Sequence, residues 1–365
     1  MPMGVEKVAA SICILAFFIC IFGIIEAHYK KPLMGIPIPS FLRVDPNERY
    51  LESIFRLGTN QYRTKATFST PIGMGEYLAL CFPFLLQFMT GRYSWWVRIG
   101  AFLTMPLLFY SVRLTDSRVG LIGSVLGTAG FVLVKAVQRW RQDKSAVLAP
   151  AVALVYPALA VAGLGLIFVS KHVHDALLGN PGDTRASTQG RIMQWKMGIP
   201  HILHNPFGYG MGQAGATLHY VNPNGTGTVD SYYLSTLLES GVLGCILFIA
   251  TWIAGISYCG LYVWKNSAFG SPTQKVQDRE LDFLVPLGCV FGAFMVIKAV
   301  FSQPDLHPIL FIELGMVVAL AWRSRAILRG ESVPLFQPKQ ARLRPGQRAP
   351  DRLQPQPQPA AARSN

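Results

Sequence analysis

Apolar runs long enough to cross a lipid bilayer recur along this chain, and they limit its possible folds more than any other feature. The eight runs lie at residues 8–25, 75–89, 99–112, 119–134, 146–170, 241–263, 281–301 and 306–322. Because 51% of the residues are hydrophobic and only 14% are charged, a soluble protein is excluded. The sequence predicts an all-α, polytopic helical membrane protein with about eight transmembrane helices and two long outer loops.

Basic residues between the runs predict the orientation of the chain. Lysines and arginines gather between the second and third, the fourth and fifth, and the sixth and seventh runs, and again after the last run. These segments all lie on one side of the membrane if both termini are cytoplasmic, which is the arrangement that the positive-inside rule favours. The two long loops, at about residues 26–73 and 171–230, then face outward.

The chain is expected to form a single transmembrane domain over residues 1–330, followed by a cytoplasmic tail over residues 331–365. Pro, Gln and Arg alternate in the tail, which cannot bury a core and is predicted to be disordered. Much of the net charge of +14 comes from the cytoplasmic segments and the tail, so no nucleic-acid partner is expected. All six cysteines lie within apolar runs and indicate neither disulfides nor zinc.

Two outward-facing features could bind an anion. The first outer loop, residues 26–73, carries seven basic and four acidic residues, a balance of +3. This balance suits a lipid diphosphate at the membrane surface, although a merely solvated loop has the same composition. Arg118 lies at the outer end of the fourth run, where it can bind a phosphate with two hydrogen bonds or extend to the lipid headgroups.

The second outer loop is polar, aromatic and rich in glycine. Ser187 or Thr188 is predicted to cap a helix that runs through Arg191 and Trp195, with apolar residues at steps of three and four. Such a helix would lie along the membrane interface and hold Arg191 at the level of the headgroups. Pro200 should kink or end this helix.

Glycines and a carboxylate follow this helix. Gly208, Gly210 and Gly212 allow a tight turn and a close backbone approach to a glycan or diphosphate, or they only link the helix to the next span. Asp230 precedes the sixth run, where it can cap the helix or accept a proton from a sugar hydroxyl.

Ionisable residues within the apolar zone are costly and usually face the protein interior. Lys298 is predicted to pair with Glu313 on this ground, and Glu239 is a second such residue. Five histidines lie in the second outer loop, but no carboxylate accompanies them at a fixed spacing, so no metal is predicted. The string from Gly210 to Gly215 matches a dinucleotide-binding pattern, yet no strand precedes it, and no cofactor is expected.

Several short strings together resemble the O-antigen ligase and polysaccharide polymerase family of membrane proteins. Those in the first half are Arg63-Thr-Lys-Ala-Thr-Phe68, Tyr77-Leu-Ala-Leu80 and Asp116-Ser-Arg118-Val-Gly120. Those in the second half are Gly190-Arg191 with Trp195, Asn205-Pro-Phe-Gly208-Tyr-Gly210-Met-Gly212, Asp230-Ser-Tyr-Tyr-Leu234 and Glu239-Ser-Gly241. Each string is degenerate, but their order, spacing and sidedness agree over residues 63–322.

This resemblance implies a metal-independent glycosyl transfer on the outer face of the bacterial cytoplasmic (inner) membrane. The donor would be an undecaprenyl-diphosphate-linked oligosaccharide, with membrane lipid and other polysaccharide assembly proteins as further partners. Arg118 and Arg191 match the family's arginines, which would neutralise the leaving diphosphate, and Asp230 would act as the base. Substrate contacts are expected from Arg63, Trp195, Gly208, Gly210, Gly212, Tyr232 and Glu239.

Two departures from the family pattern bear on the activity. Ligases characteristically carry His where this chain has Asp230, so the sequence favours a polymerase of repeat units over a ligase that transfers polymer to lipid A core or to protein. A non-enzymatic transport or assembly subunit is the third alternative. Only one predicted span precedes Arg63, where family members commonly have several, so a truncated or short variant is expected.

Overall fold

The computed structural model describes residues 4–31, 62–142, 181–220, 229–266, 279–300 and 308–329. Over these residues the protein is a polytopic helical membrane protein without strands, as the sequence predicts. The longer helices are α1 (Val5–Tyr29), α2 (Pro71–Thr90), α3 (Trp95–Leu114), α4 (Arg118–Gln142), α7 (Pro181–His204), α9 (Tyr232–Asn266), α10 (Leu284–Val300) and α11 (Pro308–Leu328). The short ones are α8 (Ala214–Leu218) and the 3-10 helix η4 (Leu281–Phe283).

Seven of the eight predicted runs fall on helices α1, α2, α3, α4, α9, α10 and α11. The run at residues 146–170, most of the two outer loops and the tail from residue 331 lie outside the described residues. Among the described residues, six helical segments are long and apolar enough to cross a membrane, and α11 is not one of them. The reason is its charge, because Glu313, Arg323 and Arg325 all lie on α11.

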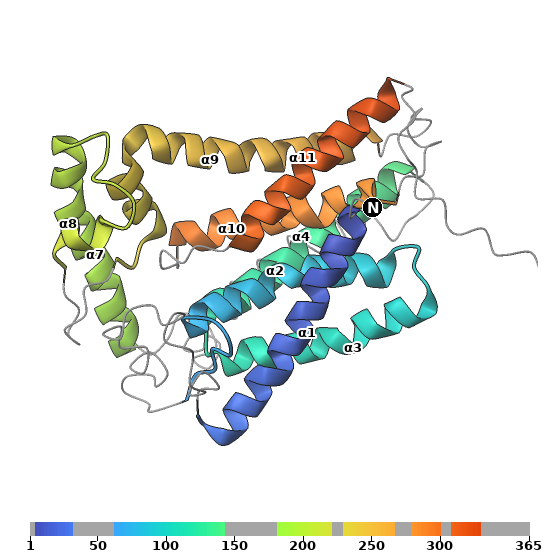
Figure 1. Ribbon diagram of the computed structural model, residues 1–365, viewed down its shortest axis with the longest axis horizontal. Coiled ribbons are helices and arrows are strands. Elements are labelled where there is room, and N and C mark those ends of the chain that lie inside the picture. The colour runs from blue at the N-terminus through green and yellow to red at the C-terminus, as the bar shows by residue number, and fades with distance from the viewer. Residues whose placement is uncertain are drawn as a thin grey trace, which may run out of the picture.

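Helix α2 occupies the centre of the bundle, with α1, α3, α4 and α10 packed around it (Figure 1). Gly75 of α2 packs against Gly120 of α4, where an added Cβ would lie 2.9 Å from the Gly75 carbonyl oxygen. Gly123 and Gly127, one and two turns further along α4, also face α2, through the side chains of Ala79 and Pro83, and Gly123 meets Ile297 of α10 as well. Small residues at this spacing let two helices approach closely in a membrane. The two helices therefore run parallel, with their N-termini side by side.

Helices α7 and α8 lie at one end of the bundle, which we call the α7 end (Figure 1). The N-terminus of the chain lies at the opposite end. There, Arg279 bonds Glu6 at 2.6 Å, Arg323 bonds Glu280 at 3.2 Å, and the Arg141 guanidinium stacks on a tryptophan ring. Segments that the charge pattern predicts to be cytoplasmic thus meet at the end opposite α7.

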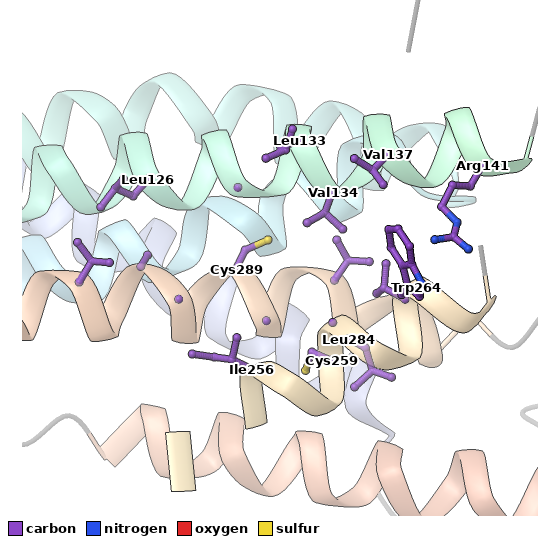
Figure 2. A pocket seen from close by; sticks show the side chains of 18 residues that line it. Leu126, Leu133, Val134, Val137, Arg141, Ile256, Cys259, Trp264, Leu284 and Cys289 are labelled. Carbon is purple, nitrogen blue, oxygen red and sulfur yellow. The ribbon is translucent and has the colours of Figure 1, made fainter. Parts of the chain in front are cut away.

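An apolar cavity of about 480 Å³ lies between α4, α9 and α10 (Figure 2). Leu126, Cys259 and Cys289 are among its lining residues, and Arg141 and Trp264 lie together toward one end. Arg141 and Trp264 lie in the last turns of α4 and α9, so the part of the cavity next to them lies away from the α7 end. Its lining suits a hydrocarbon chain rather than a sugar.

Candidate functional site

Glu26, near the C-terminus of α1, organises the segment that carries Arg63. Its carboxylate is fully buried and accepts hydrogen bonds from the Tyr62 hydroxyl at 2.8 Å and from the backbone N–H groups of Lys65 and Ala66 at 3.2 and 2.7 Å. Donors to a charged acceptor form strong hydrogen bonds, so the segment is held firmly against α1. Burial raises the pKa of the Tyr62 hydroxyl, and the adjacent Glu26 adds to this effect.

Arg63 and Arg118 both lie next to the tight turn between α3 and α4. The Arg63 Nε donates to the Thr115 carbonyl oxygen at 3.1 Å. Asp116 adopts a left-handed conformation with φ 47°, and the Ser117 hydroxyl accepts the Gly120 N–H at 3.2 Å, which caps α4. Arg118 is therefore the first residue of α4, at a helix N-terminus that favours anions.

Asp230 is hydrogen-bonded to a residue on α7 that sequence reasoning missed, Gln194. The Gln194 amide oxygen accepts the Asp230 backbone N–H at 2.8 Å, and its Nε2 donates to the Asp230 carboxylate at 3.4 Å. Gln194 is fully buried and lies three residues after Arg191 on α7, so the two side chains share one helix face. The three-residue spacing from Arg191 could have indicated that Gln194 shares its helix face, but nothing in the sequence indicated that Gln194 contacts Asp230.

Neither helix cap considered for this region is present in the structure. α7 begins at Pro181 rather than after Ser187 or Thr188, because proline is itself a favourable first residue of a helix. Asp230 is not the cap of α9, which begins at Tyr232, since the Ser231 carbonyl accepts the first helical hydrogen bond, from the Ser235 N–H at 3.0 Å. α7 continues through Pro200 and ends at His204.

A buried ion pair lies beside the start of α9. Lys298 Nζ bonds the Glu76 carboxylate at 2.8 Å, and it lies 4.9 Å from the centre of the Tyr232 ring. The predicted pair of Lys298 with Glu313 is therefore wrong. Lys298 is near the C-terminus of α10, next to the first turns of α2, and the packing of these two helices brings Glu76 to it. Tyr232 thus lies between the Asp230 region and the central helix.

The predicted glycine turn packs onto α9. α9 is interrupted at Gly241, where φ is 72°, and the chain after α7 donates hydrogen bonds from the Tyr209 and Gly210 N–H groups to the Leu238 and Glu239 carbonyls at 2.7 and 3.0 Å. A Cβ on Gly208 would lie 2.5 Å from the Glu239 carbonyl oxygen. The close approach that Gly208 allows is therefore made to α9.

The remaining predicted contact residues have different surroundings. Gly210 has φ 103° and Gly212 has φ 76°, and Gly212 has open space where a Cβ would lie. Trp195 packs against the apolar cluster that includes Leu234. The Glu239 carboxylate accepts a hydrogen bond from the Ser235 hydroxyl of its own helix at 3.4 Å.

These features define an integral membrane protein with a polar, arginine-bearing region at one end of a helical bundle. Residues 77–249 match the family model described as O-antigen ligase, so this part of the chain is similar to that family. The matched segment includes Arg118, Arg191 and Asp230, whereas Arg63 precedes it. A comparison with curated proteins found no match.

Proposed function

We propose that this protein polymerises lipid-linked oligosaccharide repeat units of an exopolysaccharide or O-antigen on the outer face of the cytoplasmic membrane. The family match supports the coarser statement that it takes part in membrane glycan processing of the O-antigen ligase and polymerase type. The polymerase reaction, the undecaprenyl-diphosphate donor and the outward orientation of the α7 end belong to the proposal.

The observation that carries the proposal is that Arg63 is bonded to the turn that immediately precedes Arg118. Both guanidinium groups belong to residues fixed next to the parallel N-termini of α2 and α4, whose dipoles add positive potential. Lys65 lies two residues after Arg63, and burial lowers the pKa of its ammonium group while the nearby Glu26 opposes that shift. A diphosphate is the ligand that this arrangement suits best.

Asp230 supplies the acid–base group of the proposed reaction. The acceptor hydroxyl attacks the anomeric carbon of the donor, its proton passes to the Asp230 carboxylate, and the bond from that carbon to the diphosphate oxygen breaks. The electron pair of this bond stays on the diphosphate, whose charge the arginines stabilise. Gln194 orients the carboxylate without neutralising it, because an amide carries no charge.

The outer side of α7 fits the approach of a lipid-linked substrate. Ile192 and Met193 on α7 are 52% and 51% exposed, and Phe207 in the following turn is 84% exposed. Apolar side chains exposed beside Arg191 suit a helix that lies in the membrane interface. A polyprenyl chain would then contact these residues while its diphosphate reaches the arginines.

The second candidate function is a ligase that transfers finished polymer to lipid A core or to protein. The description of the matching family, O-antigen ligase, favours it. The two reactions leave different precursors in cells that lack the protein. A missing polymerase leaves single lipid-linked repeats, whereas a missing ligase leaves long lipid-linked polymer that is not attached to its final acceptor.

This precursor analysis tests the proposal. We expect single lipid-linked repeats to accumulate in the deletion strain and to disappear when the wild-type chain is restored. Accumulation of long unattached polymer would establish the ligase instead. Accumulation of neither species would identify a transport or assembly role without glycosyl transfer.

A further inference from the structure

Two glutamates are buried inside the bundle, and their surroundings differ. Glu76 on α2 is 2% exposed and is paired with Lys298 at 2.8 Å. Glu313 on α11 is 0% exposed, and neither of its carboxylate oxygens has a hydrogen-bond partner among the described residues. The lysine expected to neutralise Glu313 is held by Glu76.

Among the residues that the structure describes, the groups around Glu313 offer no positive charge. Cys13 on α1 and Tyr77 and Cys81 on α2 lie within electrostatic range of its carboxyl group, and these are its titratable neighbours in the described part of the chain. The Tyr77 hydroxyl donates to the carbonyl oxygen of Ile12 at 3.0 Å, and the Cys81 thiol to that of Tyr77 at 3.3 Å. Neither donor is therefore directed at Glu313.

An ionised carboxylate in such a place would lack both a counter-ion and a donor. Burying a lone charge costs far more than burying a neutral acid, and the group takes up a proton instead. Ionisable residues inside a membrane protein normally face a partner or have a function. We propose that Glu313 is a proton-binding site within the bundle, whose carboxyl group is the neutral acid at neutral pH, whereas Glu76 is the carboxylate.

The proposal gives the two glutamates different chemical reactivity. A neutral carboxylic acid adds across a C=N bond of a carbodiimide: its oxygen bonds to the central carbon, its proton passes to nitrogen, and no atom leaves. An apolar carbodiimide such as dicyclohexylcarbodiimide partitions into the membrane and reaches acids there. Glu313 is therefore the modification site expected inside the bundle, and the ionised Glu76 is not.

Infrared difference spectra of the purified full chain test the proposal directly, because they need no reagent to reach the site. Wild type minus Glu313→Gln at neutral pH should show the carbonyl band of a protonated carboxyl group, shifted in heavy water. The control removes both members of the ion pair, Glu76→Gln with Lys298→Met, so that no buried charge is left unpaired. This control should lose carboxylate bands only.

Loss of carboxylate bands in Glu313→Gln would overturn the proposal. Mass spectrometry after dicyclohexylcarbodiimide treatment gives the second measurement. We expect the whole mass of the reagent on the α11 peptide of the wild type and none on the same peptide of Glu313→Gln. Labelling of Glu76 equal to that of Glu313, or no label on Glu313, contradicts the neutral acid.

Discussion

The role proposed for Arg118 and Arg191 depends on the shape of the guanidinium group as well as on its charge. Arg118→Lys and Arg191→Lys keep the charge but lose the two-pronged donor that fits a phosphate. Each change should lower the rate of polymer formation by about 100-fold, with the protein still present in the membrane. The measurement is product yield and chain length from purified lipid-linked repeats in vesicles.

Arg98→Lys is the matched control for these substitutions. Arg98 is exposed, donates to the Gly91 carbonyl at 2.7 Å, and lies at the end of the bundle opposite α7. Its replacement should leave product yield unchanged. Normal yield and chain length in both Arg191→Lys and Arg191→Ala would show that Arg191 does not bind the diphosphate.

Asp230→Asn separates a catalytic carboxylate from a structural one. Asparagine has the same size, keeps the backbone N–H that Gln194 binds, and can still accept from the Gln194 amide, so the thermal midpoint should not change. Without a proton acceptor, polymer formation should fall by about 10²- to 10⁴-fold and single lipid-linked repeats should accumulate. A normal chain-length ladder from this variant would defeat the assignment of Asp230 as the base.

Gln194→Glu tests the orientation of Asp230. The new carboxylate can still accept the Asp230 N–H, but it replaces the amide donor with a second negative charge beside the first. The proton affinity of Asp230 should rise, and the pH at which polymerisation reaches half its maximum should shift upward. An unchanged pH profile would show that Gln194 does not act through Asp230.

Single residues were predictable where the signal is local. The Asp116-Ser-Arg118 string correctly placed an arginine at the start of a helix. The partner of Lys298 was predicted wrongly because it depends on which helices are neighbours, and apolar periodicity does not specify this. Gln194 and Glu26 act through residues 36 to 40 positions away in the chain, and no local pattern reports such contacts.

At the scale of elements, the turn after α7 and the interruption of α9 form one unit. The two segments exchange backbone hydrogen bonds, including one from the Val242 N–H to the Pro206 carbonyl at 2.9 Å. Gly208→Ala would place a methyl group against the α9 backbone at a φ of 87°, and should destabilise the protein by about 1–3 kcal/mol. Thermal unfolding of the solubilised protein measures this effect.

Gly215→Ala controls for the loss of a glycine near the same place. Gly215 lies in α8, has open space where a Cβ would lie, and has no positive φ, so alanine should be neutral or slightly stabilising. Equal thermal midpoints for Gly208→Ala and Gly215→Ala would show that the turn does not support α9.

The presence of the helices was predictable from the sequence, and their ends were less so. Apolar runs correctly located seven helices, because in lipid the backbone must satisfy its own hydrogen bonds. The sixth apolar run was predicted to begin at residue 241, which is where α9 bends, whereas the helix itself begins nine residues earlier, close to the cap position considered at Asp230. Hydropathy finds the apolar part of such a helix, while its polar beginning is stabilised by α7 and α8.

At the scale of the whole molecule, charged side chains gather at both ends of the bundle. At the end opposite α7, basic side chains are neutralised by acidic ones or stacked on aromatic rings, as in Arg279 with Glu6 and Arg141 with Trp264. At the α7 end, Arg63 and Arg118 lie beside helix N-termini that repel cations. The dipoles of these two helices favour an anionic ligand at this end, which is consistent with the proposed diphosphate site.

The orientation of these two ends is the last prediction. The positive-inside pattern predicts that both termini are cytoplasmic and that α7 lies outside. A reporter that is active only in the cytoplasm should be inactive when fused at Gly182, in the first turn of α7, and active when fused after Leu328, at the end of α11. A reporter that is active only outside should give the opposite pair of results. Cytoplasmic activity at Gly182 would place the arginines on the inner face, where the proposed outer-face polymerisation could not take place.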